Sequence, residues 1–257
     1  MSQRLRRPGR TRTVRHLGAA ALLLASLGGL AACGGNDDST ASDPAASSTD
    51  SPSDSPSDSP SDSPSAATSG GASDVNCDYV AGGDAARKVD LPPTTPSVSG
   101  TVDATIATSI GDLKVTMDAD TTPCTVNSFV SLADQGYFDG TTCHRLVTQG
   151  IYVLQCGDPL GTGYGGPGYT IPDEVTGSEK YTAGVLAMAK TQAPNSGGSQ
   201  FFIVYADSEL PPQYTIFGKV DAAGLAAVAK AAQAGTTNGS PDGTPKTPVD
   251  ISKVTIG

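Results

Sequence analysis

The sequence predicts a mainly β domain, a closed antiparallel barrel with two helices, preceded by an export signal and a polar spacer. Three observations support this class: many short strand-like runs separated by glycines, two isolated amphipathic stretches, and a Ser/Pro/Asp-rich composition confined to the N-terminal part. Many short strands with glycine-rich turns and few helices are typical of barrels. We expect the barrel to occupy residues 98–257 of the 257-residue chain.

The first 32 residues have the form of a secretory signal. They contain six arginines and no acid, and an apolar stretch at residues 19–30 follows. A basic region, a short apolar region and small residues before a cleavage point define such a signal. The apolar stretch is shorter than the roughly 20 residues that a membrane-spanning helix needs. Arg6 and Arg7 lack the apolar continuation of a twin-arginine signal, which favours the general secretory route.

The signal ends in Leu-Ala-Ala-Cys at residues 30–33, which resembles the lipobox of bacterial lipoproteins. In such proteins the cysteine is lipidated and becomes the mature N-terminus. The alternative is an ordinary signal with a chance cysteine. With more than one acyl chain, Cys33 would hold the protein firmly on a membrane. We therefore expect an exported protein anchored to the outer face of the bacterial cytoplasmic membrane.

Residues 33–97 are expected to join this anchor to the barrel. Residues 34–71 consist largely of Ser, Asp, Ala, Pro and Gly and include the tandem SPSDSPSDSPSDSPS at 51–65. Such a segment has too little apolar surface to offset the entropy of ordering, so it predicts a disordered tether. The four-residue period is far below the 20 or more residues of a stacked repeat. A short extension containing Cys77 completes the segment.

The net charge argues against one class of partner. Without residues 1–32, 10 basic residues remain against 26 acids, a formal net charge of about −16. Nucleic-acid binding is disfavoured because no basic patch is available for phosphates.

Four cysteines remain after Cys33, at positions 77, 124, 143 and 156. An even number in an oxidising compartment favours two disulfides, with three possible pairings. A zinc site is the alternative. The sequence has no C-x-x-C pair and only His144 to assist, so no metal is expected.

The first elements are a hairpin and a helix. The runs TVDATIATS and DLKVTMD alternate apolar and polar residues and meet at Ile110-Gly111, which predicts two paired strands. A helix is expected over residues 123–135, with Thr122 as its cap, Pro123 at its first position and Gly136 at its end. Its buried face has 3.6-residue spacing: Val126, Phe129, Val130 and Ala133.

Further strands and one helix follow. The strand-like runs are TTCHRLV, IYVLQC, AGVLAMA, SQFFIVY and YTIFGKV, and VDISKVTI closes the chain. The second helix is expected over residues 222–234, with Asp221 as its cap and Gly235 as its stop.

Few residues could carry chemistry. A Ser-His-Asp hydrolase would need His144 as its base, but there is no G-x-S-x-G motif and Arg145 would oppose an imidazolium. The glycines at 161, 163 and 166 match G-x-G-x-x-G, but Pro167 follows and no helix begins there. What remains is Arg145 on a strand with apolar neighbours. It could be an ion-pair member or a donor to a carbonyl, and residue chemistry alone favours the ion pair.

A resemblance alters that preference. The blocks FDGTTCHRLV, VLQCGDP, GYGGPGY, VLAMA, PNSGGSQFFI and YTIFGKV are similar in content and order to the cyclophilin peptidyl-prolyl isomerases, over residues 101–256. This resemblance implies a closed eight-stranded antiparallel barrel capped by two helices. It also implies a monomer without cofactor or metal that isomerises X-Pro bonds in proline-containing polypeptides, here exported or surface polypeptides as they fold.

The resemblance also assigns the site. Arg145 matches the family's catalytic arginine, and Gln155 the glutamine of its Q-G-G-D block. The implied substrate-binding residues are His144, Tyr152, Val153, Ala189, Gln200, Phe202, Leu210 and Tyr214.

Several positions depart from the family pattern. Two additional residues between Arg145 and Gln155 are expected to change the pocket rim, and Lys190 replaces a common Asn. Cys143 and Cys156 replace a usual Phe and a common Gly. If their strands form a hairpin, these two cysteines would face one another, leaving Cys77 to pair with Cys124.

Two other functions are compatible with this reading. A proline-peptide receptor or chaperone could use the same pocket with little turnover, and a structural lipoprotein could merely present loops. A binding-only descendant would be expected to lose the arginine, and a structural one to accept polar residues in the pocket. Because Arg145 and the apolar positions are present, we expect the isomerase.

Overall fold

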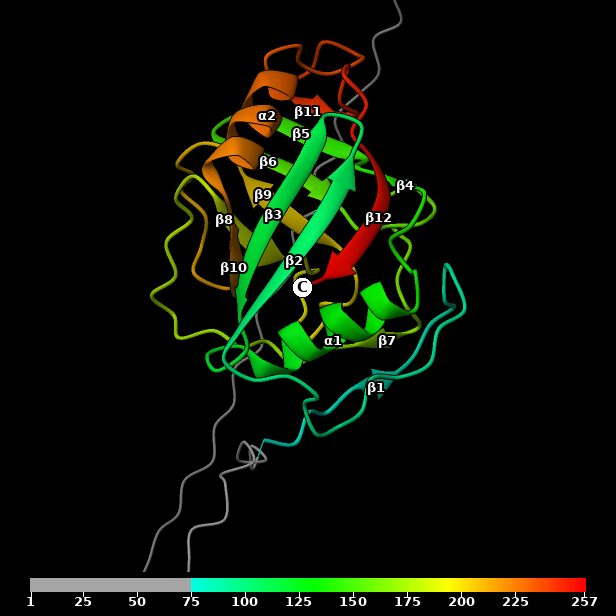
Figure 1. Cartoon of the computed structure of the whole chain (residues 1–257). Coiled ribbons are helices and arrows are strands. Elements are labelled where there is room, and N and C mark those ends of the chain that lie inside the picture. The colour runs from blue at the N-terminus through cyan, green and yellow to red at the C-terminus, as the bar shows by residue number, and fades with distance from the viewer. Residues whose placement is uncertain (1–74) are drawn as a thin grey trace, which may run out of the picture. The chain divides into compact units, whose positions relative to one another are not determined.

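The computed structural model describes residues 75–257. The expected signal, the lipidation site at Cys33 and the spacer lie outside the described residues. Residues 75–257 contain the helices α1 (Pro123–Asp134) and α2 (Ala222–Ala232), and neither is long and apolar enough to cross a membrane (Figure 1). The strands are β1 (Val80–Ala81), β2 (Thr101–Thr108), β3 (Gly111–Asp118), β4 (Thr141–Thr142), β5 (Arg145–Gln149), β6 (Ile151–Cys156), β7 (Tyr169–Thr170), β8 (Val185–Met188), β9 (Phe201–Val204), β10 (Ile216–Val220), β11 (Asp242–Gly243) and β12 (Asp250–Ile256).

Most strands join one curled antiparallel sheet. Within the described part its ten strands follow the order β11-β5-β6-β9-β8-β10-β3-β2-β12-β4, and β1 pairs separately with β7. Eight of the ten have four or more residues. The two ends of the order approach each other, because β4 runs into β5 after two residues and the Cys143 backbone N–H donates to the Val249 carbonyl at 2.9 Å. The mainly β class with two helices is therefore confirmed.

Alternation along the strands builds two apolar clusters. Phe201 and Ile203 of β9 point into the main core, whereas Phe202 and Val204 point into a second cluster on the other face. Successive strand residues face opposite sides of a sheet, so β8 and β9 are buried throughout. Each fully buried side chain of this size contributes about 1.5 to 3 kcal/mol. The second cluster lies beneath the candidate site described below.

The helices follow the predicted pattern with one correction. Val126, Phe129, Val130 and Ala133 are buried as predicted, but Thr122 makes no side-chain capping bond because its hydroxyl donates back to the Asp118 carbonyl. The Glu174 carboxylate caps α1 instead, accepting from the backbone N–H groups of Cys124 (2.9 Å) and Thr125 (2.8 Å). In α2 the predicted cap is confirmed: Asp221 accepts from the Gly224 N–H at 2.9 Å.

Residues 75–97 form an extended segment that wraps beside α1 and β7, which we call the strap (Figure 1). Cys77 is 1% exposed and belongs to the main core, so packing begins well before the expected boundary at residue 98. The described residues contain two disulfides, Cys77–Cys124 and Cys143–Cys156, which are the pairings predicted. The first ties the strap to α1, and the second ties the start of β5 to the end of β6.

Candidate active site

Arg145 begins β5, where a neighbouring strand fixes its side chain. β11 pairs with β5, and this brings Asp242 beside the guanidinium. The Asp242 carboxylate accepts from Arg145 Nε at 2.8 Å and from Nη2 at 2.7 Å. This paired geometry fits the planar guanidinium, and its hydrogen bonds raise the pKa of Arg145 and lower that of Asp242. Arg145 is therefore in an ion pair and still lies at the edge of a pocket.

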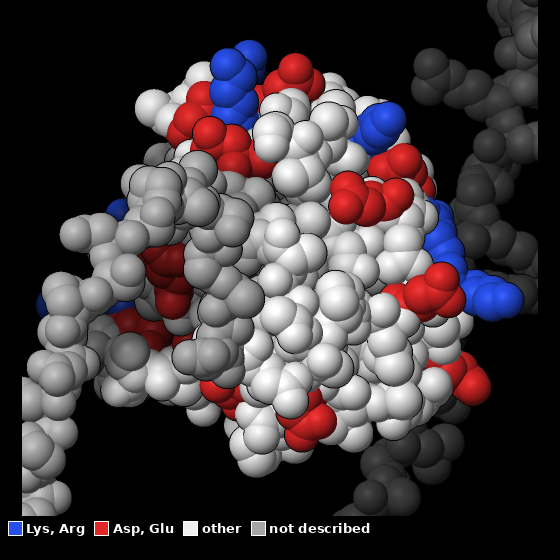
Figure 2. Space-filling model, turned by 60° about the horizontal axis from the view of Figure 1, so that its bottom comes forward, with Lys and Arg blue, Asp and Glu red and all other residues white. Residues whose placement is uncertain are grey.

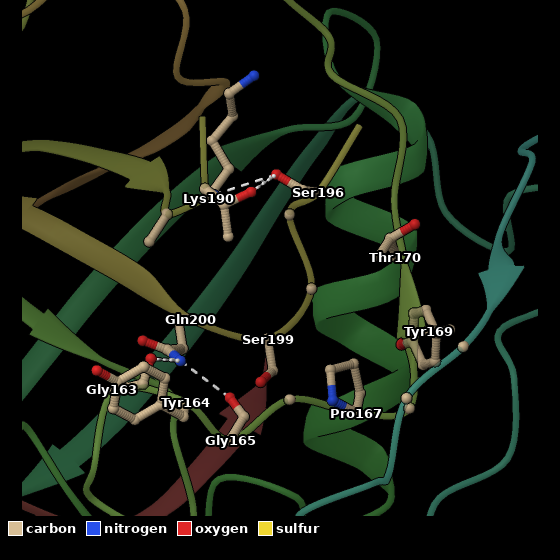
Figure 3. A pocket seen from close by; sticks show the side chains of 18 of the residues that line it. Gly163, Tyr164, Gly165, Pro167, Tyr169, Thr170, Lys190, Ser196, Ser199 and Gln200 are labelled. Atoms are coloured by element: carbon tan, nitrogen blue, oxygen red, sulfur yellow. Dashed lines mark hydrogen bonds between the residues drawn. The ribbon is translucent and has the colours of Figure 1, made fainter. Parts of the chain in front are cut away.

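A chain of amides fixes the other side of the guanidinium. Gln200 Nε2 donates to the carbonyls of Gly163 and Gly165, both at 2.9 Å, which settles the orientation of its amide (Figure 3). Gln200 Oε1 then accepts from Gln155 Nε2 at 2.8 Å. Gln155 Oε1 is thereby turned toward Arg145 and accepts from Nη1 at 3.1 Å. The glycine-rich loop thus orients Arg145 through two glutamines.

A pocket of about 180 Å³ lies beside this guanidinium; most of its lining residues are aliphatic or aromatic, so we call it the apolar pocket. It lies over the second apolar cluster, where Phe202 is 5% and Val153 3% exposed. The rings of Phe202 and Tyr214 meet edge to face at 5.5 Å. Seven of the ten site residues predicted from the sequence line it: Arg145, Val153, Gln155, Ala189, Phe202, Leu210 and Tyr214.

Tyr152 is placed elsewhere, and Ile151 takes the place expected for it. β6 pairs with β5 in the register Arg145 to Gln155, with a tight turn at Gly150, whose φ is 79°. On this strand Ile151, Val153 and Gln155 share the pocket face. Tyr152 faces the opposite side, where its ring meets that of Tyr205 edge to face with the ring centroids 5.9 Å apart. The two additional residues lengthen the hairpin, and Ile151 forms part of the rim.

His144 and Gln200 line neighbouring hollows. His144 borders one of about 430 Å³ on the far side of Arg145, together with Asp242 and the loop 161–164. Neither of its ring nitrogens has a hydrogen-bond partner among residues 75–257. Burial lowers the pKa of His144, the nearby Arg145 lowers it further, and Asp158 opposes both. The imidazole is therefore neutral at neutral pH. Gln200 borders a third hollow, of about 400 Å³, and Gln155 lines all three.

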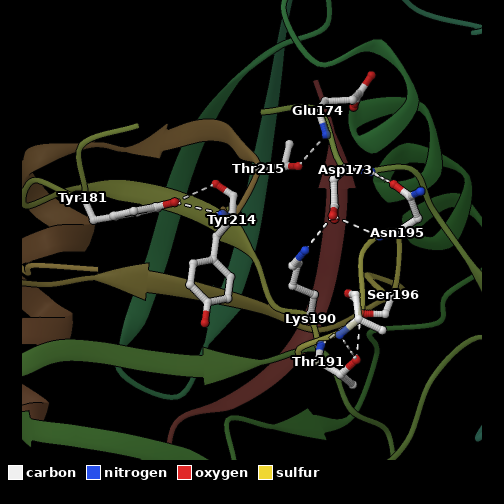
Figure 4. A network of polar contacts seen from close by, with 10 residues as sticks. Asp173, Glu174, Tyr181, Lys190, Thr191, Asn195, Ser196, Tyr214 and Thr215 are labelled. Carbon is white, nitrogen blue, oxygen red and sulfur yellow. Dashed lines mark hydrogen bonds and ion pairs between the residues drawn. The ribbon is translucent and has the colours of Figure 1, made fainter. Parts of the chain in front are cut away.

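Lys190 lies at the rim, but its charge is already paired (Figure 4). Its ammonium contacts Asp173 Oδ2 at 2.5 Å, and the two side chains are only 8% and 15% exposed. Asn195 completes this contact, donating its backbone N–H to Asp173 at 2.9 Å and accepting the Asp173 N–H at 2.8 Å. The pair holds the loop that contains Lys190 and Asn195 against Asp173. The residue after Asp173 is Glu174, which caps α1.

Sequence reasoning missed Asp242, Ile151 and the Lys190–Asp173 pair. Asp242 had one visible signal, since it is the only acid between Asp221 and Asp250. The face shown in Figure 2 has a broad uncharged centre with acidic side chains around it and Lys and Arg at its edges, in keeping with the acidic composition. No group of three or more potential metal ligands was found among the described residues.

A curled antiparallel β-sheet with two helices thus holds a guanidinium, with free N–H donors, beside a small pocket. The chain belongs to the cyclophilin-type peptidyl-prolyl cis-trans isomerase family, because the model described as "Cyclophilin type peptidyl-prolyl cis-trans isomerase/CLD" matches residues 102–256.

Named relatives agree with this assignment. A probable peptidyl-prolyl cis-trans isomerase B of Mycobacterium tuberculosis (strain ATCC 25618 / H37Rv) is 45% identical over 198 residues, covering 70% of this chain and 64% of that protein. An Arabidopsis thaliana peptidyl-prolyl cis-trans isomerase is 44% identical over 121 residues, covering 45% and 74%. A crystal structure of a Cryptosporidium parvum cyclophilin-type isomerase superposes with a TM-score of 0.53 at 31% identity, covering 61% of this chain and 98% of that one. The same protein has been crystallised in the presence of the dipeptide Ala-Pro.

Proposed function

We propose that the protein is a peptidyl-prolyl cis-trans isomerase that accelerates rotation about X-Pro bonds in exported or surface polypeptides. The observation that carries this is the Arg145 guanidinium, held by Asp242 and Gln155 at the edge of the apolar pocket. Family membership and the named relatives support the same activity.

The reaction needs binding and hydrogen bonding only. Resonance gives the peptide C–N bond partial double-bond character and a rotation barrier of about 18 to 20 kcal/mol. No covalent bond is broken, so the protein accelerates rotation by binding the twisted state more tightly than either planar state. The apolar pocket holds the proline ring between Val153, Phe202 and Leu210.

Arg145 supplies the hydrogen bond that favours the twisted state. A guanidinium has five N–H donors, and Asp242 and Gln155 occupy three of them, which leaves one on each terminal nitrogen. Donation to the pyramidal proline nitrogen weakens the resonance of the X-Pro bond, and donation to the prolyl carbonyl positions the substrate. Because its partners fix the guanidinium beforehand, little reorganisation is needed during rotation.

An X-Pro peptide assay that compares the wild type with Arg145→Ala and Arg145→Lys tests the proposal. Loss of one directed donor lowers kcat by about 100-fold or more, which is the expected result for Arg145→Ala. Arg145→Lys keeps the charge without the paired geometry and should fall between. Equal rates in wild type and Arg145→Ala would exclude the mechanism. Peptide binding without acceleration in the wild type would favour a proline-peptide receptor or chaperone.

We also propose that the protein is exported, lipidated at Cys33 and monomeric. The basic and apolar leader and the Leu-Ala-Ala-Cys motif support the first two points, and two disulfides among residues 75–257 suit an oxidising compartment. We infer, in addition, that the sheet closes into an eight-stranded barrel. The continuity of β4 with β5 and the bond from Cys143 to Val249 support closure.

A further inference from the structure

The hollow of about 400 Å³ next to the apolar pocket has a wall that lies outside the family domain. Its floor is the segment 163–170, and the segments 189–191 and 196–200 form one side (Figure 3). The other side is Gly82, Gly83 and Asp84 of the strap, whereas the family model begins at residue 102. We call this hollow the strap pocket.

The strap is held firmly where it forms this wall. β1 pairs with β7, Gly82 N–H donates to the Gly168 carbonyl at 3.0 Å, and Ala86 N–H to the Gly166 carbonyl at 2.8 Å. Arg87 Nη1 contacts the carbonyls of residues 136, 137 and 139, each at 2.8 Å. A Cβ at Gly168 would lie 3.1 Å from that of Ala85, so the glycine permits the close approach. Asp84 therefore lies between two anchored points.

Among the described residues that line the strap pocket, Asp84 is the one whose charge is not already paired. Among its lining residues only Asp84 and Lys190 are charged, and the Lys190 ammonium is buried against Asp173. Asp84 is exposed, and the rest of the lining consists of glycine and uncharged residues.

The position of Arg145 indicates which part of a peptide enters this pocket. Arg145 lies between the apolar pocket and the hollow beside His144, whereas Ala189 and Lys190 lie between the apolar pocket and the strap pocket. In the proposed reaction Arg145 faces the prolyl carbonyl, which is C-terminal to the ring. The segment before the proline then crosses Ala189. At about 3.3 Å per residue, its first three residues extend along the strap pocket.

We propose that Asp84 is a specificity determinant, which makes the strap pocket select a lysine or arginine in the three residues before the proline. This rests on the proposed isomerase function, since it uses the orientation of the peptide on Arg145. The ligand class is a cationic proline-containing polypeptide segment.

The test is a peptide series with Lys, Gln or Glu placed one, two or three residues before the proline. For the wild type, kcat/KM should be about two- to fivefold higher with Lys than with Gln at one or more of these positions, the size of an exposed ion pair. The preference should weaken as salt is added. Asp84→Asn should abolish it, and Asp84→Lys should reverse it in favour of Glu.

Asp78 provides matched controls, because it is an exposed acid of the same strap that does not line the pocket. Asp78→Asn and Asp78→Lys make the same changes in net charge and should keep the preference for Lys. Equal kcat/KM for the three peptides in the wild type, or equal effects at Asp78 and Asp84, would overturn the inference while leaving the isomerase function intact.

If no peptide is turned over, the isomerase function fails, and the affinities of the same peptides decide the inference. A preference for Lys that depends on Asp84 would still support it, and affinities independent of charge would overturn it.

Discussion

At the scale of single residues, Asp242 is the partner that gives Arg145 its direction. It accepts from two guanidinium nitrogens, but the two side chains are 41% and 49% exposed, so solvent screens the pair. The main effect of Asp242 is on the orientation of the guanidinium. Without Asp242, Arg145 would keep its charge, but only Gln155 would hold its guanidinium in place. Asp242 is therefore a positioning residue.

Asp242→Asn is expected to lower kcat by about two- to fivefold, with KM little changed, because the amide keeps one acceptor and loses the charge. Asp112→Asn is the control, since Asp112 is an exposed acid on β3 that lines none of the three hollows. Steady-state kinetics on one X-Pro peptide would measure both. A rise in KM with unchanged kcat would assign Asp242 to binding instead.

His144 predicts a dependence of stability on pH. The pKa of His144 is lowered in the folded protein, so the unfolded chain takes up this proton first as pH falls. The free energy of unfolding should therefore fall as pH drops below about 6.5, until the lower folded pKa is reached. Denaturant titrations from pH 7.5 to 4.5 should show this component in the wild type and not in His144→Gln. An equal slope in both proteins would contradict the prediction.

At the scale of elements, the sequence patterns predicted correctly those strands, helices and caps that depend on residues close together in the chain. The β2–β3 hairpin, the first helix and the Asp221 cap of α2 were found at the predicted positions, although Thr122 does not cap the first helix through its side chain. Glu174 caps α1 although it is 50 residues away from Cys124 in the sequence. Patterns of neighbouring residues cannot predict such a long-range contact. Tyr152 was placed by counting along the family's block, but strand alternation from Gln155 turns its side chain away from the pocket.

The two disulfides should act on different properties, which tests the roles of their elements. Chain-entropy estimates give about 4 kcal/mol for the Cys77–Cys124 loop and about 3 kcal/mol for the Cys143–Cys156 loop. Replacing the first pair by serine should therefore destabilise the protein more in denaturant unfolding. Replacing the second should lower kcat more, because it frees the ends of β5 and β6 that carry Arg145 and Gln155.

At the scale of the whole described part, residues 75–257, the curled sheet and the strap form one packed unit. Cys77 and Tyr79 belong to the same core as the sheet, and the Tyr79 hydroxyl donates to the Cys124 carbonyl at 2.9 Å. The match to the Mycobacterium tuberculosis relative covers 70% of the chain, about 180 residues, and so reaches back to about residue 78 or earlier. Composition predicted the change from spacer to domain, but not that the last residues before β2 pack as a wall of a pocket.

The proposed anchor is tested on the whole chain expressed in a bacterial host. Wild-type protein should be recovered with the membrane fraction and carry acyl groups detectable by mass spectrometry. Cys33→Ser should be recovered in the soluble fraction, with X-Pro isomerase activity unchanged. Wild-type protein that is free of acyl groups would favour an ordinary signal peptide.

The Cys77–Cys124 bond also determines how the domain bears mechanical load. Tension applied to the chain on the N-terminal side of Cys77 passes through this bond into the first turn of α1, whose buried face is part of the core. The strap itself, including the two-residue pairing of β1 with β7, is then bypassed and carries little of the force. With the bond reduced, the same pull would separate β1 from β7 and move Asp84 out of the strap pocket before the main sheet unfolds.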